Sequence, residues 1–155
     1  MLEIESSWTT EFVAVLTPAN ASYLAGLIDG DGHIGLHRRR TDRTRSGYNY
    51  QAHVEIASVD EQFLREVQQL IGGGCWKRKQ QGFKSHKPCY HLTITPNTLR
   101  RVLPIITPHL RLKRERALAL LEALDLVQKG RHGQSPRLHE IYMRLKNLNR
   151  RGTIE

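Results

Sequence analysis

Two aspartates separated by one residue lie among glycines near the start of the chain, in the segment Asp29-Gly30-Asp31-Gly32. Carboxylate oxygens are the ligands that hard divalent cations such as Mg²⁺ prefer. We expect Asp31 to lie just past the end of a short helix, where its glycine neighbours let the carboxylate point out of the fold, whereas Asp29 still belongs to the last turn. The alternative is that Asp31 is a solvated turn residue.

The spacing of Asp29, Asp31 and His33 also begins like a calcium-binding loop of the EF-hand type. Such a loop needs glycine at its sixth position and glutamate at its twelfth. Ile34 and Arg40 occupy these two positions, so an EF-hand is excluded.

The composition favours a polyanionic partner. Among 155 residues, 24 are Lys or Arg and 15 are Asp or Glu, so the net charge is +9 and the pI is about 10.0. Nucleic acid is the first candidate partner, although a solvated basic surface would have the same composition.

Two cysteines, Cys75 and Cys89, are too few for a disulfide framework and fit a reducing compartment. The spacing of these cysteines with His86 and His91 fits no zinc finger. No apolar run reaches the length of a membrane span, and the first residues do not resemble a signal peptide. We expect an intracellular, DNA-associated protein of the prokaryotic cytoplasm or an organelle, with no membrane partner and no small-molecule substrate.

Hydrophobic periodicity and turn residues predict an α+β fold in the order α-β-β-α-β-β-α-α-α. Thr17-Pro18 opens a first helix that ends near Asp29, and Ser58 with Glu61 forms a capping box for the second. Two hairpins are expected, one from strands at 33–40 and 48–57 and the other from strands at 75–80 and 89–95. Three later helices are expected after Thr95, at 112–129 and from Ser135 onward.

The nine residues 24–32, Leu-Ala-Gly-Leu-Ile-Asp-Gly-Asp-Gly, resemble the LAGLIDADG signature at every position except Gly30, where the signature has alanine. The likeness extends from about Asn20 to Gly152. It implies a single endonuclease domain over 1–155, with an N-terminal extension (1–17), a core (18–149) and a C-terminal tail (150–155). The implied fold is αββαββα, a saddle-shaped antiparallel sheet for DNA with the C-terminal helices packed behind it.

The resemblance also implies an active site. By position in the motif, the Asp31 carboxylate and the Gly30 carbonyl would bind Mg²⁺, for which Mn²⁺ would substitute, while Ca²⁺ would support binding without cleavage. Lys113 corresponds to a family lysine at the floor of the active site. Ser58 stands where relatives often carry a glutamine that orders water, and its capping role is an adequate structural alternative.

Small residues line one side of the motif helix. Ser22, Gly26 and Gly30 follow one another at intervals of four residues, with Ala25 beside them, and such a stripe permits close backbone approach. Packing against the protein's own sheet would explain it. The resemblance instead implies that two copies pair through this helix. A chain with one motif would then be a homodimer that makes a staggered double-strand break in a long pseudo-palindromic site.

Alternating polar residues predict a DNA-reading face. A two-stranded ribbon can enter the major groove and present every second side chain to base edges. This set is His37, Arg39, Thr41, Asn49, Gln51, His53, Glu55, Lys77 and Lys79, while Arg38, Arg40, Arg150 and Arg151 are expected at phosphates.

Two other functions fit the same fold. An intron RNA maturase would keep the basic sheet, and a DNA-binding regulator would keep the sheet without hydrolysis. The presence of Asp31 and Lys113 argues against the regulator and leaves the maturase open.

Overall fold

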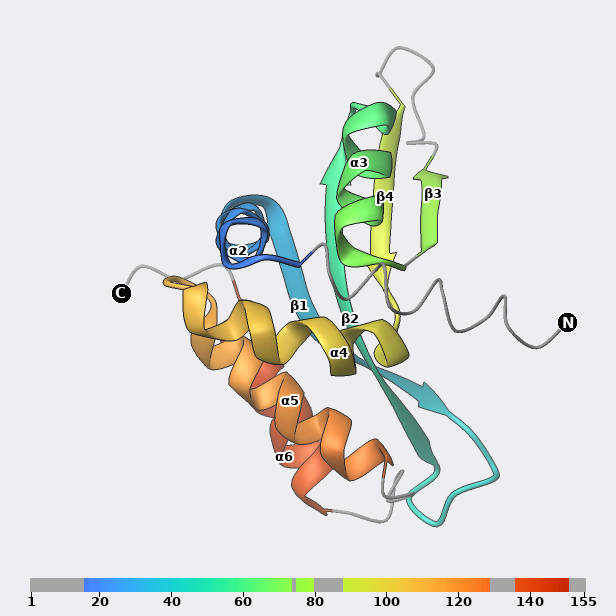
Figure 1. Ribbon diagram of the computed structural model, residues 1–155. Helices are drawn as coiled ribbons and strands as arrows, with labels where there is room; N and C mark the ends of the chain where they lie inside the picture. The colour runs from blue at the N-terminus through green and yellow to red at the C-terminus, as the bar shows by residue number, and fades with distance from the viewer. Residues whose placement is uncertain (1–15, 74, 80–87, 129–135, 151–155) are drawn as a thin grey trace, which may run out of the picture.

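The computed structural model describes residues 16–73, 75–79, 88–128 and 136–150, and for 75–79 it describes the backbone alone. In chain order the elements are α2 (Pro18–Asp31), β1 (Gly32–Arg40), β2 (Tyr48–Ser58), α3 (Glu61–Ile71), β3 (Cys75–Lys79), β4 (Cys89–Ile94), α4 (Pro96–Ile106), the 3₁₀ turn η1 (Thr107–His109), α5 (Arg114–Gln128) and α6 (Pro136–Leu148) (Figure 1). The predicted α+β class and element order are confirmed.

The strands form one antiparallel sheet in the order β1-β2-β4-β3. The first hairpin pairs Gly32 with Ile56 and Arg40 with Tyr48. Its turn ends at Gly47, whose φ of 73° is in the left-handed region that glycine adopts without steric cost. The N–H of Thr41 donates to the Gly47 carbonyl at 2.9 Å, which closes the loop.

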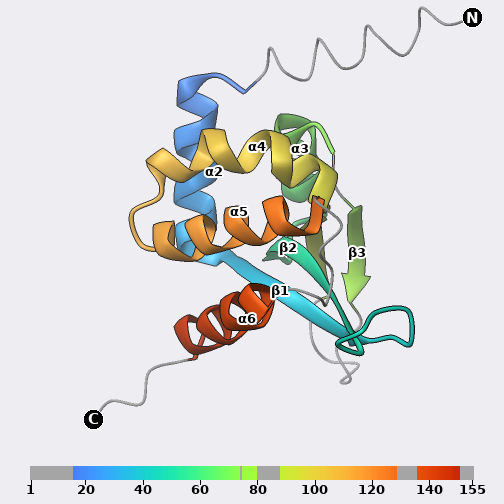
Figure 2. The same ribbon diagram turned by 90° about the horizontal axis from the view of Figure 1, so that it is seen from below.

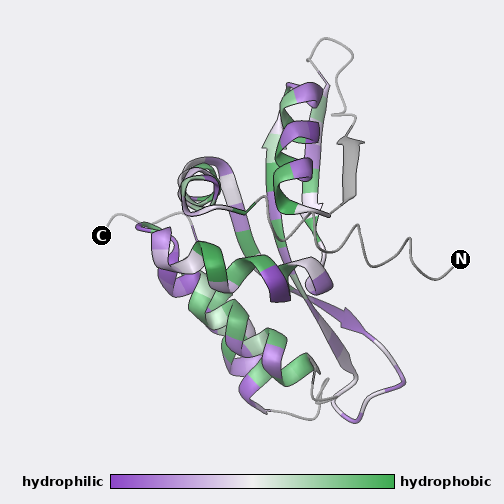
Figure 3. Ribbon diagram, viewed as in Figure 1, coloured by the Kyte–Doolittle hydropathy of each residue, from purple (hydrophilic) through white to green (hydrophobic). Residues whose placement is uncertain are grey.

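Alternation along the strands separates an apolar face from a polar one. The apolar face is buried under helices and includes Ile34, Leu36, Tyr50, Ala52, Val54, Ile56, Leu92 and Ile94. Figure 2 shows α2, α4 and α5 on one side of the sheet, with α6 beside β1. The end of β1 near the hairpin is hydrophilic, while hydrophobic residues recur along α4 and α5 (Figure 3).

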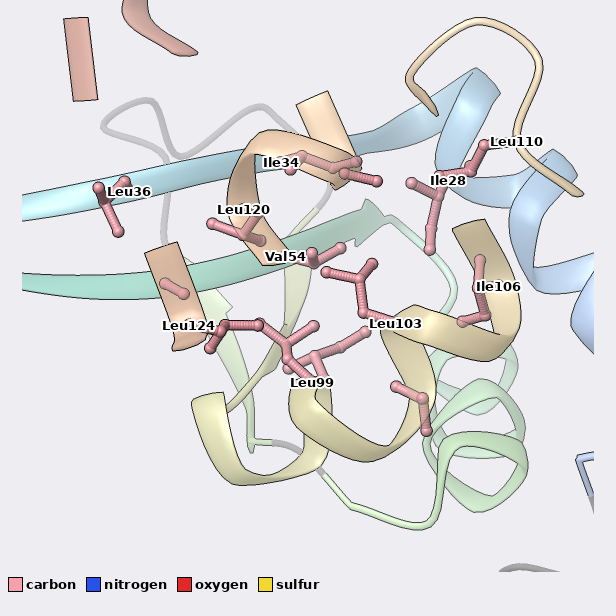
Figure 4. Close-up of a cluster of buried hydrophobic side chains, with 14 of the residues drawn as sticks. Ile28, Ile34, Leu36, Val54, Leu99, Leu103, Ile106, Leu110, Leu120 and Leu124 are labelled. Atoms are coloured by element: carbon pink, nitrogen blue, oxygen red, sulfur yellow. The ribbon is translucent and has the colours of Figure 1, made fainter. Parts of the chain in front are cut away.

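The core joins helices that are distant in sequence to the first hairpin. In Figure 4, Ile28 of α2, Ile34 of β1 and Val54 of β2 point toward Leu103 of α4 and Leu120 of α5. Each of these five side chains is almost completely buried. Burial of one such side chain contributes about 1.5–3 kcal/mol, so this cluster fixes the end of α2 relative to the sheet.

The first helix is longer than its sequence suggested. Thr17 is the N-cap, as expected, and its hydroxyl accepts from the Asn20 N–H at 3.2 Å. The helix continues through Gly30 to Asp31, so the expected end near Asp29 was wrong. Gly32 is the C-cap in an extended conformation, and an added Cβ there would lie 2.7 Å from the Ile28 Cα. The close approach of the helix to β1 therefore requires glycine at position 32.

The second helix begins differently from the capping box predicted at its start. The N-cap is Asp60, whose carboxylate accepts from the Phe63 N–H at 3.0 Å. Ser58 ends β2, and its hydroxyl accepts from the Asp60 N–H. Glu61 pairs with Arg65 at 2.7 Å instead of returning to the cap. The helix ends at Ile71, and Gly72 is its C-cap in the left-handed conformation.

The long helix α5 begins at Arg114, two residues later than expected, because the preceding segment is bonded to α2. None of the helices in the described parts of the chain is both long enough and apolar enough to cross a membrane.

Candidate active site and nucleic-acid interface

Asp31 lies at the junction between α2 and β1. It is the last residue of the helix, its side chain is exposed, and Gly32 begins the first strand directly after it. Its carboxylate makes no hydrogen bond or ion pair with the residues that the structure describes. Both carboxylate oxygens are therefore available to an external ligand at the start of the polar face of β1.

Asp29, one residue before Gly30, faces the protein instead. Its carboxylate accepts from three successive backbone N–H groups, those of Arg111 at 2.8 Å, Leu112 at 3.2 Å and Lys113 at 2.9 Å. These N–H groups precede α5, where helix donors have no intrahelical partner. Asp29 therefore serves as the cap of a helix that begins more than eighty residues later in the chain.

Lys113 reciprocates this contact. Its ammonium group donates to the carbonyl of Ile28 at 2.8 Å and to that of Gly32 at 2.5 Å, at the end of α2. A positive charge at the N-terminal end of α5 would oppose that helix's dipole. The structure turns the Lys113 charge toward the C-terminal carbonyls of α2, where a cation is favourable. We call this two-way contact the Asp29–Lys113 clasp.

The pKa values of both members of the clasp are lowered, for different reasons. Partial burial of Asp29 raises its pKa, but the N–H donors of Arg111, Lys113 and Leu112, aided by the Lys113 charge, outweigh this and hold the pKa below 3.8. Burial lowers the pKa of Lys113, as does the nearby charge of Arg116, against the opposing effects of Asp29 and Asp31. The charge of Asp31 is thus close enough to act on Lys113.

The other predicted catalytic residue lies at the same end of the sheet. Ser58 is two residues along β2 from Ile56, the partner of Gly32. It is half-buried, and its hydroxyl oxygen accepts from the Asp60 N–H at 3.1 Å. This turn contact is a local structural role, and a catalytic role for Ser58 stays a prediction.

The stripe on α2 is divided between the surface and the core. Ser22, Gly26 and Gly30 are exposed, and an added Cβ on either glycine would meet nothing within 4 Å. Ala25 is fully buried in the core, so its prediction as an interface residue was wrong: it is one residue out of phase with the exposed stripe. Tyr23, about half exposed, lies beside the open positions.

The polar face of the first hairpin carries several of the predicted DNA-reading residues. His37 and Arg39 on β1 and Asn49 and Gln51 on β2 are exposed, and the register pairs His37 with Gln51 and Arg39 with Asn49. Thr41 lies in the hairpin loop, where its hydroxyl accepts from the Arg43 N–H, so the expected strand position was wrong.

His53 occupies this face but is only 6% exposed. Its ring stacks on His37 with centroids 3.7 Å apart, and it lies across Gly35, where a Cβ would be 2.8 Å from its Cε1. Burial, with repulsion from His37 and His33, lowers the pKa of His53 to about 4. The predicted base contact by His53 is not favoured, because the side chain forms the floor beneath His37.

Glu55 is also engaged within the protein. One carboxylate oxygen forms a short contact with Nδ1 of His91, and the other accepts from the Thr93 hydroxyl at 3.4 Å. The sequence predicted that Glu55 would face the base edges of DNA. The neighbouring strand β4 supplies partners that the pattern of β2 alone does not reveal.

Arg38 and Arg40 fall on the helix side of the sheet by strand alternation, opposite Arg39. The Arg38 guanidinium lies 4.3 Å from the centre of the Tyr48 ring and 4.7 Å from that of Tyr142. The predicted phosphate contact is therefore not favoured for Arg38, because its guanidinium is held between two rings, although the residue is exposed. Arg40 is exposed, and its contact with phosphate stays a prediction.

Four of the predicted DNA contacts belong to β3 or to the residues after α6 in the sequence. Lys77 and Lys79 are in β3, paired with His91 and Cys89, and this register puts them on the polar face. Arg150 is exposed after α6. Arg151 lies outside the described residues.

Sequence reasoning missed the capping role of Asp29 and the partnership of His91 with Glu55. Both contacts join residues more than thirty positions apart, so no local pattern signals them. The only available signal for Asp29 was its place in the final turn of α2, from which a side chain can reach a neighbouring helix.

Comparison with known proteins supports the resemblance seen in the motif. Residues 24–122, more than half of the chain, match the model of the LAGLIDADG endonuclease family. No curated protein sequence matches this chain at a significant level.

Solved structures share its fold. The homing endonuclease I-CvuI, in complex with its target, is 19% identical, with a TM-score of 0.72, over 88% of this chain and 85% of that one. The archaeal intron-encoded homing endonuclease I-Vdi141I, complexed with DNA, is 17% identical, with a TM-score of 0.74, over 86% of each chain. The homing endonuclease I-TnaI is 22% identical, with a TM-score of 0.68, over 86% of this chain and 95% of that one.

These structures confirm the homing endonuclease fold expected from the sequence. The signature at 24–32, the match over 24–122 and the shared fold agree with one another. The chain belongs to the LAGLIDADG endonuclease family.

Proposed function

We propose that this protein is a site-specific DNA endonuclease that cuts both strands of a long pseudo-palindromic duplex as a homodimer. The observation that carries the proposal is the placement of Asp31. Its unengaged carboxylate ends a helix that the Asp29–Lys113 clasp fixes, next to the first residue of the polar sheet face.

The residues at this position fit a hard divalent cation. The Asp31 carboxylate and the Gly30 carbonyl are oxygen donors, and Mg²⁺ needs only one or two protein oxygens because it keeps several waters. When bound there, such a cation would supply an activated water and neutralise charge on the scissile phosphate. Mn²⁺ is expected to substitute, and Ca²⁺ to support DNA binding without cleavage.

Lys113 would contribute a fixed positive charge beneath this site. Its ammonium group is held by the Ile28 and Gly32 carbonyls, so it does not have to be ordered when DNA arrives. A preorganised cation stabilises charge that develops on a phosphate. The same two contacts keep Asp31 in position, so Lys113 would have both an electrostatic and a positioning role.

Homodimer formation through α2 is supported by the open stripe of Ser22, Gly26 and Gly30. Absent Cβ atoms at Gly26 and Gly30 leave room for a second backbone to approach. A twofold arrangement of this stripe would bring two Asp31 side chains together, one for each DNA strand. Because each chain carries a single motif, cleavage of both DNA strands requires two chains to pair.

The polar sheet face would contact the duplex. Asn49 and Gln51 can pair with adenine and Arg39 with guanine, and their exposure leaves these groups available. The net charge of +9 supports binding to the phosphate backbone.

The test uses a library of supercoiled plasmids with randomised inserts, incubated with the protein and Mg²⁺. We expect a linear product cut at one site, with short 3′ overhangs read by sequencing the ends. The Asp31→Asn variant should bind the selected site with unchanged affinity and cut it at least about 1000-fold more slowly, since the metal-binding charge is lost.

The matched control is Asp42→Asn, which removes an exposed carboxylate from the hairpin loop. It should cut normally. Binding of the selected DNA without scission by the unaltered protein would contradict the enzyme assignment, and Mg²⁺-dependent turnover by Asp31→Asn would contradict the assigned site. Preferential binding of structured RNA would favour a maturase.

A further inference from the structure

Three side chains that the proposed nuclease site does not use form a chain of contacts on the polar face of the sheet. Cys89 and His91 are alternate residues of β4, and the Cys89 Sγ lies 3.7 Å from His91 Nε2. The other ring nitrogen of His91, Nδ1, forms a short contact with Glu55 of β2. The order is therefore thiol, imidazole, carboxylate.

The carboxylate determines which nitrogen of His91 carries the proton. A carboxylate oxygen accepts, so Nδ1 of His91 must donate to Glu55, and in the neutral ring Nε2 is then left as an acceptor. Nε2 faces the thiol of Cys89, which is free and half-buried. The Tyr90 carbonyl, 3.9 Å from the sulfur, is a second acceptor for the thiol proton but cannot take it up.

The Glu55 carboxylate is itself held in place. Its second oxygen accepts from the Thr93 hydroxyl at 3.4 Å, and the sheet register puts Thr93 directly opposite Glu55. A nucleophile, a base within reach of it and a third group that orients the base are the arrangement that activates cysteine in enzymes. The contacts run from Cys89 to His91 and from His91 to Glu55, and in the described part of the chain no three such side chains are placed so that they could hold one metal ion.

We propose that Cys89 is a modification site, a thiol that His91 deprotonates and that reacts with small disulfides of the glutathione class. The proton of Cys89 moves to His91 Nε2, and the thiolate attacks one sulfur of the disulfide. A bond forms between the Cys89 sulfur and that sulfur, the original S–S bond breaks, and the departing thiolate takes the proton from His91. The products are a mixed disulfide on Cys89 and one free thiol.

This modification would act on DNA binding, a consequence that rests on the proposed function. Cys89 is on the same face of the sheet as Gln51, by the register of β2 with β4 and strand alternation. A glutathione adduct adds bulk and net negative charge to this face, and like charge facing a phosphate backbone weakens binding. Reducing the mixed disulfide would restore it.

The test begins with Cys75→Ser, which leaves Cys89 as the single cysteine of the chain. Its reaction with oxidised glutathione is followed by mass, and its reaction with an aromatic disulfide by absorbance, at pH 7. A free cysteine is only a few per cent thiolate at that pH, so we expect the folded protein to react about tenfold faster than the same protein in urea. A half-buried thiol without a base would react more slowly when folded.

Two further variants identify the base. His91→Gln and Glu55→Gln in the Cys75→Ser background should each lower the folded rate by about tenfold. The matched control is His139→Gln on α6, outside the chain of contacts, which should leave the rate unchanged. The proposal is overturned if the folded Cys75→Ser protein reacts with the disulfide no faster than the same protein in urea. This comparison requires no substitution at Cys89, His91 or Glu55.

DNA binding is measured separately with the reduced and glutathionylated protein. We expect about tenfold weaker binding after modification, recovery with dithiothreitol, and no response in Cys89→Ser. Equal binding before and after modification would refute the effect on DNA. Absence of DNA binding by the reduced protein would refute the proposed function instead, and the thiol rates would still decide whether Cys89 is activated.

Discussion

Asp29 and Lys113 each bond to the backbone at the end of the other residue's helix. The Asp29 carboxylate accepts from the N–H groups that lead into α5, and the Lys113 ammonium donates to carbonyls at the end of α2. The two contacts together tie the end of α2 and the start of β1 to the turn that leads into α5. The clasp also fixes the position of Asp31, which is two residues beyond Asp29.

Loss of either member of the clasp should destabilise the fold. Asp29→Asn and Lys113→Met are each expected to lower the free energy of unfolding by about 1–2 kcal/mol, because charge-assisted bonds to a helix end are lost. The double variant should lose less than the sum, by about 0.5–1 kcal/mol. Urea denaturation gives the free energy of unfolding of the unaltered protein, the two single variants and the double variant. Asp42→Asn, the exposed control, should change stability little, and strict additivity would show that the two contacts are independent.

The clasp should also matter for catalysis. Asp29→Ala leaves Asp31 in the sequence but releases the end of α2, and displacement of a catalytic group by about 1 Å can cost about 100-fold in rate. We expect a cleavage rate lowered by this order at saturating DNA, with the Kd for the site unchanged. Normal single-turnover cleavage by a folded Asp29→Ala protein would argue against a positioning role.

Two neighbouring positions on α2 should respond oppositely to leucine. Gly26 faces open space, so Gly26→Leu should stabilise the isolated protomer slightly through helix propensity while blocking close helix pairing. Ala25 is completely buried, and Ala25→Leu should cost about 1–3 kcal/mol by overpacking. Sedimentation and thermal unfolding of both variants distinguish association from stability. A Gly26→Leu protein that associates as the unaltered protein does would exclude this stripe from the dimer interface.

Substitution of two adjacent arginines on β1 should have different effects on DNA binding and on stability. Arg39→Ala is expected to weaken DNA binding and to relax the preference for guanine at one position of the site, because the proposed contact to guanine is lost. Removal of this cation should also reduce the slope of log K against log salt by about one. Arg38→Ala should leave the slope unchanged and lower stability by about 0.5–1 kcal/mol through loss of its contacts with Tyr48 and Tyr142. Titrations at several salt concentrations, with thermal unfolding, test both, and an altered salt slope in Arg38→Ala would contradict the assignment.

His53 makes stability depend on pH. Its folded pKa of about 4 lies below the ordinary value of 6.5, so between these two values the unfolded chain binds more protons than the folded one. Its contribution is complete above pH 6.5 and falls as pH decreases toward 4, by up to about 3 kcal/mol. In His53→Phe the free energy of unfolding should change less with pH between 4 and 6.5. His109→Gln, an exposed control, should keep the pH dependence of the unaltered protein. An unchanged pH profile in His53→Phe would place the dependence elsewhere.

Local sequence pattern was sufficient to predict most of the secondary-structure elements and to select a candidate metal-binding carboxylate. Alternation from Tyr48 to Ile56, the Thr17 cap and the glycines after α3 lead to the observed strands and helices, because their determinants lie within a few residues. The signature at 24–32 selected Asp31 as a candidate metal ligand, and the family resemblance of the segment before the long helix selected Lys113.

Tertiary structure decided what each side chain contacts. Asp29 accepts a hydrogen bond from the Lys113 N–H, Glu55 contacts His91, and Ala25 is buried in the core. All three follow from the packing of residues that are distant in the chain. A one-residue difference in helical phase separates Ala25 from Gly26, and the choice of N-cap between Ser58 and Asp60 depends on where β2 ends. The sequence determines which groups are present and how they are spaced along each element. Their contact partners depend on the three-dimensional packing that brings separate elements together.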